Sequence, residues 1–500
     1  MTGAAAADYL GQLMIYAVAI PALATLPIVV FGRWPNLREA MTLAAAGLLF
    51  ATVLRALWLF DAIGESTATL WEIFPGLSLS FTVEPLGMLF ALVASSLWIV
   101  NSIYSIGYMR GNKEDNQTRF YVCFAIAISS TMWVAFSGNM LTLFFGYEML
   151  TLSTYPLVAH SGKPEAIQGG RTYLGILLAT SIGLLLLGVL MTWQITGTLD
   201  FRPGGILAGP VAAGAIDGRT VGLLLFLYMF GTGKAALMPI HRWLPAAMVA
   251  PTPVSALLHA VAVVKAGVFT VVKVIVYIFG VDLLANTGEA GWLLYIAGFT
   301  IIMASIIALR QDNLKRRLAY STVSQLSYVV MAAAILAPLS VVGAAMHIAA
   351  HAFGKITLFF AAGSIYTAAH KTEVSQLDGI GRRMPWTMGA FAVGALSMIG
   401  IPPTVGFTSK WFILQGAMAA GQMVAVVVIV ASTLLNAAYF VPIVYRAFFR
   451  KPPDDGVDHV HGEAPLPIVI ALTATAIATI LLFFLPQLPL SLSRQLMFGG

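Results

Sequence analysis

Long apolar runs separated by short polar stretches repeat along the whole chain. Most runs reach about 20 residues, the length that an α-helix needs to cross a bilayer, and they lack the roughly ten-residue alternation of membrane β-barrel strands. The runs predict fourteen helices, at 12–32, 37–60, 82–105, 119–137, 139–160, 170–194, 219–243, 252–279, 291–309, 316–336, 339–369, 387–418, 422–448 and 466–490. We therefore expect an all-α polytopic membrane protein.

Basic residues gather in alternate loops between these segments. The loops after the odd-numbered segments hold eighteen Lys and Arg residues, whereas the other loops hold only Arg202 and Arg219. Because cytoplasmic loops are enriched in Lys and Arg, this asymmetry predicts that both termini lie on the periplasmic or extracellular side of the cell (inner) membrane. No basic stretch precedes 12–32 and no small-residue cleavage site follows it, so we interpret it as a retained helix.

The amino-acid composition limits the classes of protein and of cofactor that are compatible with this chain. A hydrophobic fraction of 59% with only 10% charged residues excludes a soluble protein. The single cysteine, Cys123, excludes a disulfide framework, a CxxC pair and a cysteine-ligated iron–sulfur cluster within this chain. We therefore expect a membrane protein with no redox chemistry of its own, and we predict no cofactor and no nucleic-acid partner.

Setting aside the charges assigned to the loops leaves seven charged residues within the predicted helices. They are Arg55, Glu148, Lys234, Lys265, Lys273, Lys355 and Lys410. Each costs roughly 3 kcal/mol at the bilayer centre when it faces lipid unpaired, so such residues normally face protein or water. Arg55 and Lys273 lie nearer the outer ends of their segments, where we expect their side chains to extend toward the interface.

Glu148, Lys234 and Lys265 lie deepest. Glu148 is the only carboxylate near the midplane, and the two lysines lie roughly 20 Å from a helix end at 1.5 Å per residue. A Glu–Lys pair whose separation can change is able to take up and release a proton. The alternatives are a structural hydrogen bond for Glu148 and a permanently paired lysine.

The string "HIAAHAFGK" places His347, His351 and Lys355 on one face of 339–369. Such a stripe suits a proton relay through intervening waters. Ligation of haem or a metal by the histidines, with His259 as an opposed ligand, and a packed polar face are the competing interpretations.

Two lysines stand beside helix breakers. Lys234 lies in "FGTGKAALMPIHRW", and Lys410 follows "IGIPPTVGFTSK". Proline removes a backbone hydrogen bond and interrupts a helix, and unwound backbone at membrane depth is tolerated only beside a cavity or inside protein. Paired interrupted segments indicate an inverted-repeat transporter with an ion path at the breaks.

Long ordered strings resemble the antiporter-like subunit family, which comprises the proton-pumping membrane subunits of respiratory complex I and their relatives in Mrp-type antiporters and membrane-bound hydrogenases. The strings include "EPLGMLFALV", "FFGYEMLTLSTYPLV", "GTGKAALMPIHRWLPAAMVAPTPVSALLHAVAVVKAGVF", "LKRRLAYSTVSQLSYV", "HIAAHAFGKITLFFAAGSI" and "GIPPTVGFTSKW". The resemblance implies helices at 1–118, two inverted five-helix repeats at 119–285 and 286–450, and a last helix within 451–500.

The resemblance also implies a role for each deep residue. Glu148 would pair with Lys234 on the first broken helix, and Lys265 would continue a hydrophilic axis, with His259 as a second-rank site beside it. His347, His351 and Lys355 would connect the two repeats, and Lys410 would end the axis on the second broken helix. Whether a metal ion binds in this chain stays open.

Details of the sequence favour one branch of the family. Lys410 stands where the M-type subunit carries glutamate, and the chain ends about ten residues after 466–490, without the extensions of the L type and the Mrp A subunit. "YSIGYMRGNKEDNQTRFYV" and "TLSTYPLVAHSGKPEA" look more like the Mrp D group than the N type of complex I. We expect a proton-translocating subunit of a Na+ or K+/proton antiporter, with other membrane subunits, the bilayer, protons and Na+ or K+ as partners.

Three alternatives remain at this point. One is an N-type subunit of a complex I-like NADH/quinone or ferredoxin-linked oxidoreductase or of a membrane-bound hydrogenase. The second is a structural or haem-carrying membrane anchor that conducts nothing. The third is a stand-alone permease for an organic solute.

Overall fold

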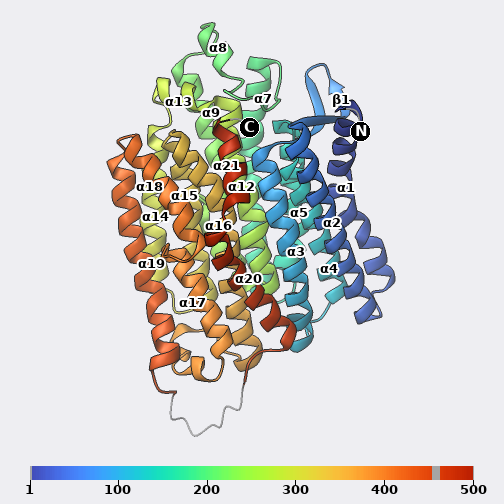
Figure 1. Cartoon of the computed structure of the whole chain (residues 1–500), viewed down its shortest axis with the longest axis vertical. Helices are drawn as coiled ribbons and strands as arrows, with labels where there is room; N and C mark the ends of the chain where they lie inside the picture. The colour runs from blue at the N-terminus through green and yellow to red at the C-terminus, as the bar shows by residue number, and fades with distance from the viewer. Residues whose placement is uncertain (1–2, 453–461, 499–500) are drawn as a thin grey trace.

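The structure is a computed structural model that describes residues 3–452 and 462–498. Figure 1 shows helices lying side by side along the long axis of the molecule. The first half of the bundle is α1 (Gly3–Val30), α2 (Pro35–Ile63), α3 (Pro85–Gly111), α4 (Gln117–Ala135), α5 (Met140–Val158), α6 (Pro164–Thr180), η1 (Ser181–Leu185), α7 (Leu186–Thr196), α8 (Ala208–Ala212), α9 (Gly218–Gly231) and η2 (Gly233–Ala235).

The second half continues with η3 (Ile240–Arg242), α10 (Trp243–Ala246), η4 (Ala247–Val249), α11 (Thr252–Ala256), η5 (Leu257–Val261), α12 (Val263–Lys273), η6 (Val274–Phe279), α13 (Val281–Thr287), α14 (Gly291–Arg310), α15 (Leu314–Ala334), α16 (Pro338–Ala369), η7 (Val374–Gln376), η8 (Ile380–Arg382), α17 (Pro385–Ile399), α18 (Val405–Ala419), α19 (Met423–Phe449), α20 (Leu466–Phe484) and α21 (Gln487–Phe498). Each of the fourteen predicted segments contains a helix, and the expected all-α polytopic class is confirmed.

Hydropathy alone identifies fewer spans than the fold contains. Within the described residues, nine helices are long and apolar enough to cross a membrane, or ten if the bent pair Val263–Phe279 and Val281–Thr287 counts as one. α9 and α17 are too short because each ends at a break, and α15 carries many polar residues that face protein. The interior of the bundle is thus more polar than its lipid-facing rim.

A β-hairpin between α2 and α3 was not predicted. β1 (Ser66–Phe74) pairs with β2 (Leu77–Val83) in an antiparallel ladder, where the sequence analysis expected a loop and a helix starting at 82. Its Ser, Thr and Trp side chains alternate around the turn at Pro75–Gly76, which favours strands. In Figure 1 β1, α8 and α13 lie at the same end of the bundle, as the alternation of basic loops requires.

Burial distinguishes the centre of the bundle from its flanks. α16 is almost wholly buried and lies in the middle of Figure 1, whereas α1, α19 and α20 expose many large apolar side chains. In a membrane protein such exposed faces suit lipid or partner helices. α16 is the element that carries His347, His351 and Lys355, so the polar stripe runs through the protein interior.

Candidate functional site

The first broken helix places Lys234 where the backbone is unwound. α9 ends at Gly231, Lys234 occupies the single 3-10 turn η2, and Ala236 adopts a left-handed conformation with φ of +56°. A Cβ atom at Gly267 of α12 would collide with the backbone of Lys234, so glycine is required for α12 to pack against the break. The Trp243 indole donates to the Gly233 carbonyl over 2.9 Å and satisfies one backbone group that the break leaves free.

The Lys234 amine binds α5. Its Nζ atom donates to the Tyr147 carbonyl over 2.7 Å and to Thr151 Oγ1 over 2.6 Å, and the side chain is fully buried. The ion pair expected with Glu148 is not formed: among the described residues none joins them within 4.0 Å, and Glu148 Oε1 has no hydrogen-bond partner. Tyr147 and Thr151 flank Glu148 on α5, so the carboxylate stands beside the amine without neutralising it through a direct contact.

The side chains of Lys265 and His351 are in direct contact. Lys265 Nζ lies 2.7 Å from His351 Nδ1, and both residues are buried. Lysine donates and a neutral imidazole nitrogen accepts, so a proton can pass between these atoms without a bridging water. This contact joins α12 to α16.

The polar side chains along α16 contact different neighbouring helices. His347 Nδ1 lies 2.9 Å from Ser409 Oγ of α18, while Lys355 Nζ donates to Ser321 Oγ of α15 over 2.7 Å. The His347 and His351 ring centroids are 6.1 Å apart, too far for a direct hydrogen bond. α16 therefore links α12, α15 and α18, and water is needed to complete the link along α16 itself.

The second broken helix holds its lysine in another way. α17 ends at Ile399, Gly400 has φ of +90°, and α18 begins at Val405. Lys410 Nζ, on α18, donates to the Met398 carbonyl over 2.6 Å and to the Ile399 carbonyl over 3.1 Å. The negative end of the α17 dipole thus faces a cation.

Several polar residues of this network were missed in the sequence analysis. The Met398 carbonyl also accepts from Gln325 Nε2 and Asn436 Nδ2, each over 3.4 Å, and the Tyr439 hydroxyl donates to Ser321 over 3.0 Å. Uncharged side chains such as these carry no signal in a charge search, although "STVSQLSYV" is unusually polar for a membrane segment. The His259 side chain lies outside the described part of the structure, and only its place in η5 is known.

Lys273 differs from its expected position, whereas Arg55 does not. Lys273 is fully buried and pairs with Glu84 over 3.0 Å instead of reaching the interface. The exposed Arg55 guanidinium stacks over the Trp58 ring at 4.3 Å. An ion pair at an outer helix end therefore replaces the expected snorkelling lysine.

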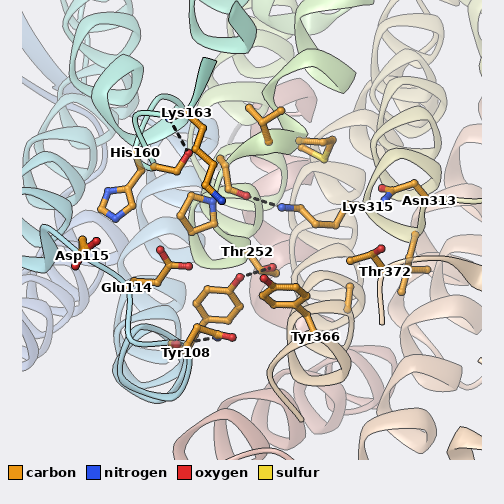
Figure 2. A pocket seen from close by; sticks show the side chains of 18 of the residues that line it. Tyr108, Glu114, Asp115, His160, Lys163, Thr252, Asn313, Lys315, Tyr366 and Thr372 are labelled. Carbon is orange, nitrogen blue, oxygen red and sulfur yellow. Dashed lines mark hydrogen bonds between the residues drawn. The ribbon is translucent and has the colours of Figure 1, made fainter. Parts of the chain in front are cut away.

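A polar cavity of about 500 Å³ opens among the basic loops. Figure 2 shows Glu114, Tyr108, Lys315 and Tyr366 pointing toward its interior from different elements. Burial and the neighbouring Asp115 charge raise the pKa of the Glu114 carboxyl. Water can fill a polar cavity of this size.

Unpaired polar atoms lie between this cavity and Lys265. Thr252 lines the cavity floor, and Ser255 follows it along the α11–η5–α12 segment that carries Lys265. Ser255 Oγ and Asn101 Oδ1 are buried without hydrogen-bond partners among the described residues. Since buried polar atoms are normally paired, these two atoms indicate sites for water.

The described residues contain no group of three or more His, Cys, Asp or Glu side chains that could hold a metal ion. The side chains gathered at the site are amines, imidazoles, hydroxyls and one deep carboxylate, all of which can exchange protons. The haem alternative would need His259, whose side chain is not described.

Comparison with known proteins agrees on one family. Residues 137–436 match the family model described as "NADH:quinone oxidoreductase/Mrp antiporter, TM". The chain is 34% identical over 369 residues to NADH-quinone oxidoreductase subunit N of Desulforudis audaxviator, covering 73% of this chain and 71% of the relative. It is 32% identical over 384 residues to subunit L of Rickettsia bellii, covering 74% of this chain but 58% of that longer relative.

Two solved structures share the fold. A chain of the Mrp complex from Dietzia sp. DQ12-45-1b superposes with a TM-score of 0.85 at 21% identity, covering 99% of this chain and 97% of that one. A chain of an archaeal membrane-bound sulfane sulfur reductase gives a TM-score of 0.84 at 22% identity, covering 97% and 96%. At these identities the likeness concerns the fold alone.

Proposed function

The chain belongs to the NADH:quinone oxidoreductase/Mrp antiporter family of membrane subunits, and on that premise we propose that it translocates protons within a multisubunit membrane complex. The observation that carries the proposal is the row of titratable side chains across the bundle. It runs from the half-buried Glu148 through the buried residues Lys234, Lys265, His351, His347, Lys355 and Lys410. Buried ionisable groups inside a membrane are costly, and their usual use is an ion pathway.

The contacts suggest how a proton moves. The Lys234 amine, now bound to Tyr147 and Thr151, accepts or releases a proton as its distance from the unpaired Glu148 carboxylate changes. Lys265 and His351 exchange a proton directly across 2.7 Å. Water at the His347 Nε2 atom, which has no hydrogen-bond partner within the described chain, continues the path toward Ser409 and Lys410.

Protons enter this path from the cavity of Figure 2. The cavity lies at the basic loops, which the charge asymmetry assigns to the cytoplasm. Asn101 and Ser255 would hold the waters that connect it to Lys265. The residues at 119–285 and 286–450 would each build one half of the path as an inverted repeat.

Within the family we favour the proton-translocating subunit of an Mrp-type Na+ or K+/proton antiporter in the cell membrane, with both termini on the outer side. The Mrp D-like strings support it, and Lys410 differs from the glutamate of the M type of complex I. An N-type subunit of a complex I-like oxidoreductase is the second candidate, because subunit N of Desulforudis audaxviator matches 73% of the chain.

The decisive experiment captures the complex through a tag on this chain and reconstitutes it in lipid vesicles that contain a pH-sensitive dye. For an Mrp-type antiporter, Na+ or K+ gradients imposed separately drive proton movement without an electron donor, and hydrophobic antiporter subunits co-purify. For the oxidoreductase, iron–sulfur subunits co-purify and proton movement requires electron transfer to quinone or another acceptor.

Single-residue variants test the path itself. Glu148→Gln and Lys234→Met should reduce proton movement by on the order of 100-fold, since proton transfer by a placed side chain typically contributes that much or more. Glu165→Gln, at an exposed carboxylate in the first turn of α6, is the matched control and should transport normally. Assembled Glu148 and Lys234 variants with wild-type rates would contradict the proposed path.

A further inference from the structure

A second buried cluster of charges lies at the end of the bundle that carries the β-hairpin. Lys273, two turns beyond Lys265 on α12, donates from Nζ to the Ser137 carbonyl over 2.6 Å. The same Nζ atom lies 3.0 Å from Glu84 Oε1 at the start of α3 and 4.1 Å from the Phe201 ring centroid. Lys273 and Glu84 are 0% and 4% exposed, so their charges are withdrawn from both lipid and bulk water.

A small cavity adjoins this ion pair. Its volume is about 20 Å³, and its lining includes Glu65, Glu84, Lys273 and Tyr277. That volume holds about one water molecule. Lys273 Nζ lies 3.0 Å from Glu84 Oε1 and donates to the Ser137 carbonyl, so an ammonium group keeps one further N–H donor, and a carboxylate oxygen can accept a second hydrogen bond. The site therefore has both a donor and an acceptor available for that water.

Glu65 connects the cluster to the outside. It lies in the connection between α2 and β1, lines the same cavity and is exposed. Burial of part of the side chain and the Glu84 charge raise the pKa of the Glu65 carboxyl, and the Lys273 charge opposes them. Together with the Tyr277 hydroxyl from η6, these are the titratable groups that the packed elements turn toward the cavity.

A purely structural role explains this arrangement poorly. A buried ion pair contributes little to stability compared with apolar side chains of similar volume, because both charges lose their hydration. The pair here also faces a second carboxylate across a water-sized space, which adds like charge. A row of lysine, buried carboxylate, water and exposed carboxylate is instead suited to passing a proton to the surface.

We propose that Lys273, Glu84 and Glu65 form an outer proton station that joins the buried axis to water at the end of the bundle carrying β1, α8 and α13. This rests on the proposed function. The Lys273 ammonium passes its proton to the paired Glu84 carboxylate, and Glu84 passes a proton through the cavity water to Glu65, which releases it to bulk water. A proton arriving from the Lys265 side then charges the neutral Lys273 amine again, so the three groups return to their starting charges.

The test uses the reconstituted complex with variants of this cluster. Glu84→Gln and Lys273→Met should each lower proton movement about tenfold or more, a change of ~1.4 kcal/mol in the barrier. The double variant Glu84→Gln/Lys273→Met distinguishes a structural role of the ion pair from a role in proton transfer. It removes both charges, so no buried charge is left unpaired. A structural pair predicts that the double variant recovers both assembly and transport, whereas a proton station predicts recovered assembly without transport.

Glu65→Gln provides a test that does not depend on folding of the interior, because Glu65 is exposed. It should shift the dependence of the transport rate on pH, and only when the pH is varied at this face of the membrane. Glu72→Gln, an exposed carboxylate on the same hairpin, is the matched control and should leave that dependence unchanged. A double variant that transports like wild type, or an unchanged pH profile for Glu65→Gln, overturns the proposal.

Failure of the proposed function has a different signature. In that case the wild-type complex itself moves no protons under any imposed gradient or electron donor. The outer station is overturned only when the wild type transports and these variants match it.

Discussion

The two broken helices contain the same ingredients but hold their lysines differently. At the first break Lys234 lies inside the unwound turn, and its amine binds Tyr147 and Thr151 on a neighbouring helix. At the second break Lys410 lies beyond the unwound segment and binds the carbonyls of Met398 and Ile399, at the end of the preceding helix α17. The first arrangement depends on how α5 is placed, whereas the second is contained within one interrupted segment.

The two lysines also differ in their acidic neighbours. Glu148 stands beside the first lysine with an unpaired oxygen, and no acidic residue of the described chain pairs with Lys410 within 4.0 Å. A charge next to a lysine changes its proton affinity as their distance changes, while fixed backbone dipoles act constantly. We therefore assign adjustable proton loading to the first break and a constant terminal site to the second.

The largest effect should follow from replacing each lysine by arginine. Arginine keeps the donors and the positive charge but does not lose its proton in proteins. Lys234→Arg and Lys410→Arg should both assemble, and proton movement in vesicles should fall by on the order of 100-fold. A normal rate for Lys410→Arg alone would mean that Lys410 only stabilises the C-terminal end of α17. In that case only the first broken helix would take part in proton transfer, and the second would be structural.

Packing at the breaks gives a smaller effect. A Cβ at Gly267 would collide with the backbone of Lys234 and Ala235, and one at Gly406 would collide with the Ser397 carbonyl. Gly267→Ala and Gly406→Ala should each destabilise the complex by ~1–3 kcal/mol, seen as a lower thermal midpoint. Gly175→Ala on α6, where no atom lies within 4 Å of the added Cβ, should keep or raise the midpoint, and equal losses at all three sites would refute the packing argument.

The smallest effect concerns the acceptors of the two amines. Thr151→Ala removes one of the two acceptors of Lys234, which corresponds to ~1 kcal/mol and a change of a few-fold in transport rate. Asn436→Ala removes a competing donor from the Met398 carbonyl and an acceptor of the Tyr439 hydroxyl, but it leaves both acceptors of Lys410 in place, so its effect on transport should be smaller. Thr151→Ser keeps the hydroxyl and should transport normally; a loss equal to that of Thr151→Ala would point to the missing methyl group.

The charged residues and the glycines and prolines that interrupt helices were the most informative part of the sequence. Lys234, Lys265, Lys355 and Lys410 were identified as buried, and all are buried in the structure. The breaks at Gly231–Pro239 and Ile399–Thr404 follow directly from glycine and proline, whose backbone preferences are local. The hairpin at 66–83 was missed because its alternating pattern is short and lies beside two strong helical signals.

Contacts between helices could not be inferred in the same way. Lys273 was expected to reach the interface, but Glu84 lies far away in sequence and becomes its partner only when α3 packs beside α12. The polar residues around Met398, and the orphaned Asn101 and Ser255 atoms, likewise acquire meaning only from their neighbours.

The sequence by itself determined that this is a membrane-embedded helical bundle with two interrupted helices and a set of deep charges, because hydrophobicity, helix breaking and charge are properties of each residue and its immediate neighbours. Only the tertiary structure decided which charges meet. It placed Lys265 against His351, left Glu148 Oε1 without a hydrogen-bond partner among the described residues and paired Lys273 with Glu84, because hydrogen bonds and ion pairs act over a few ångströms between segments far apart in the chain.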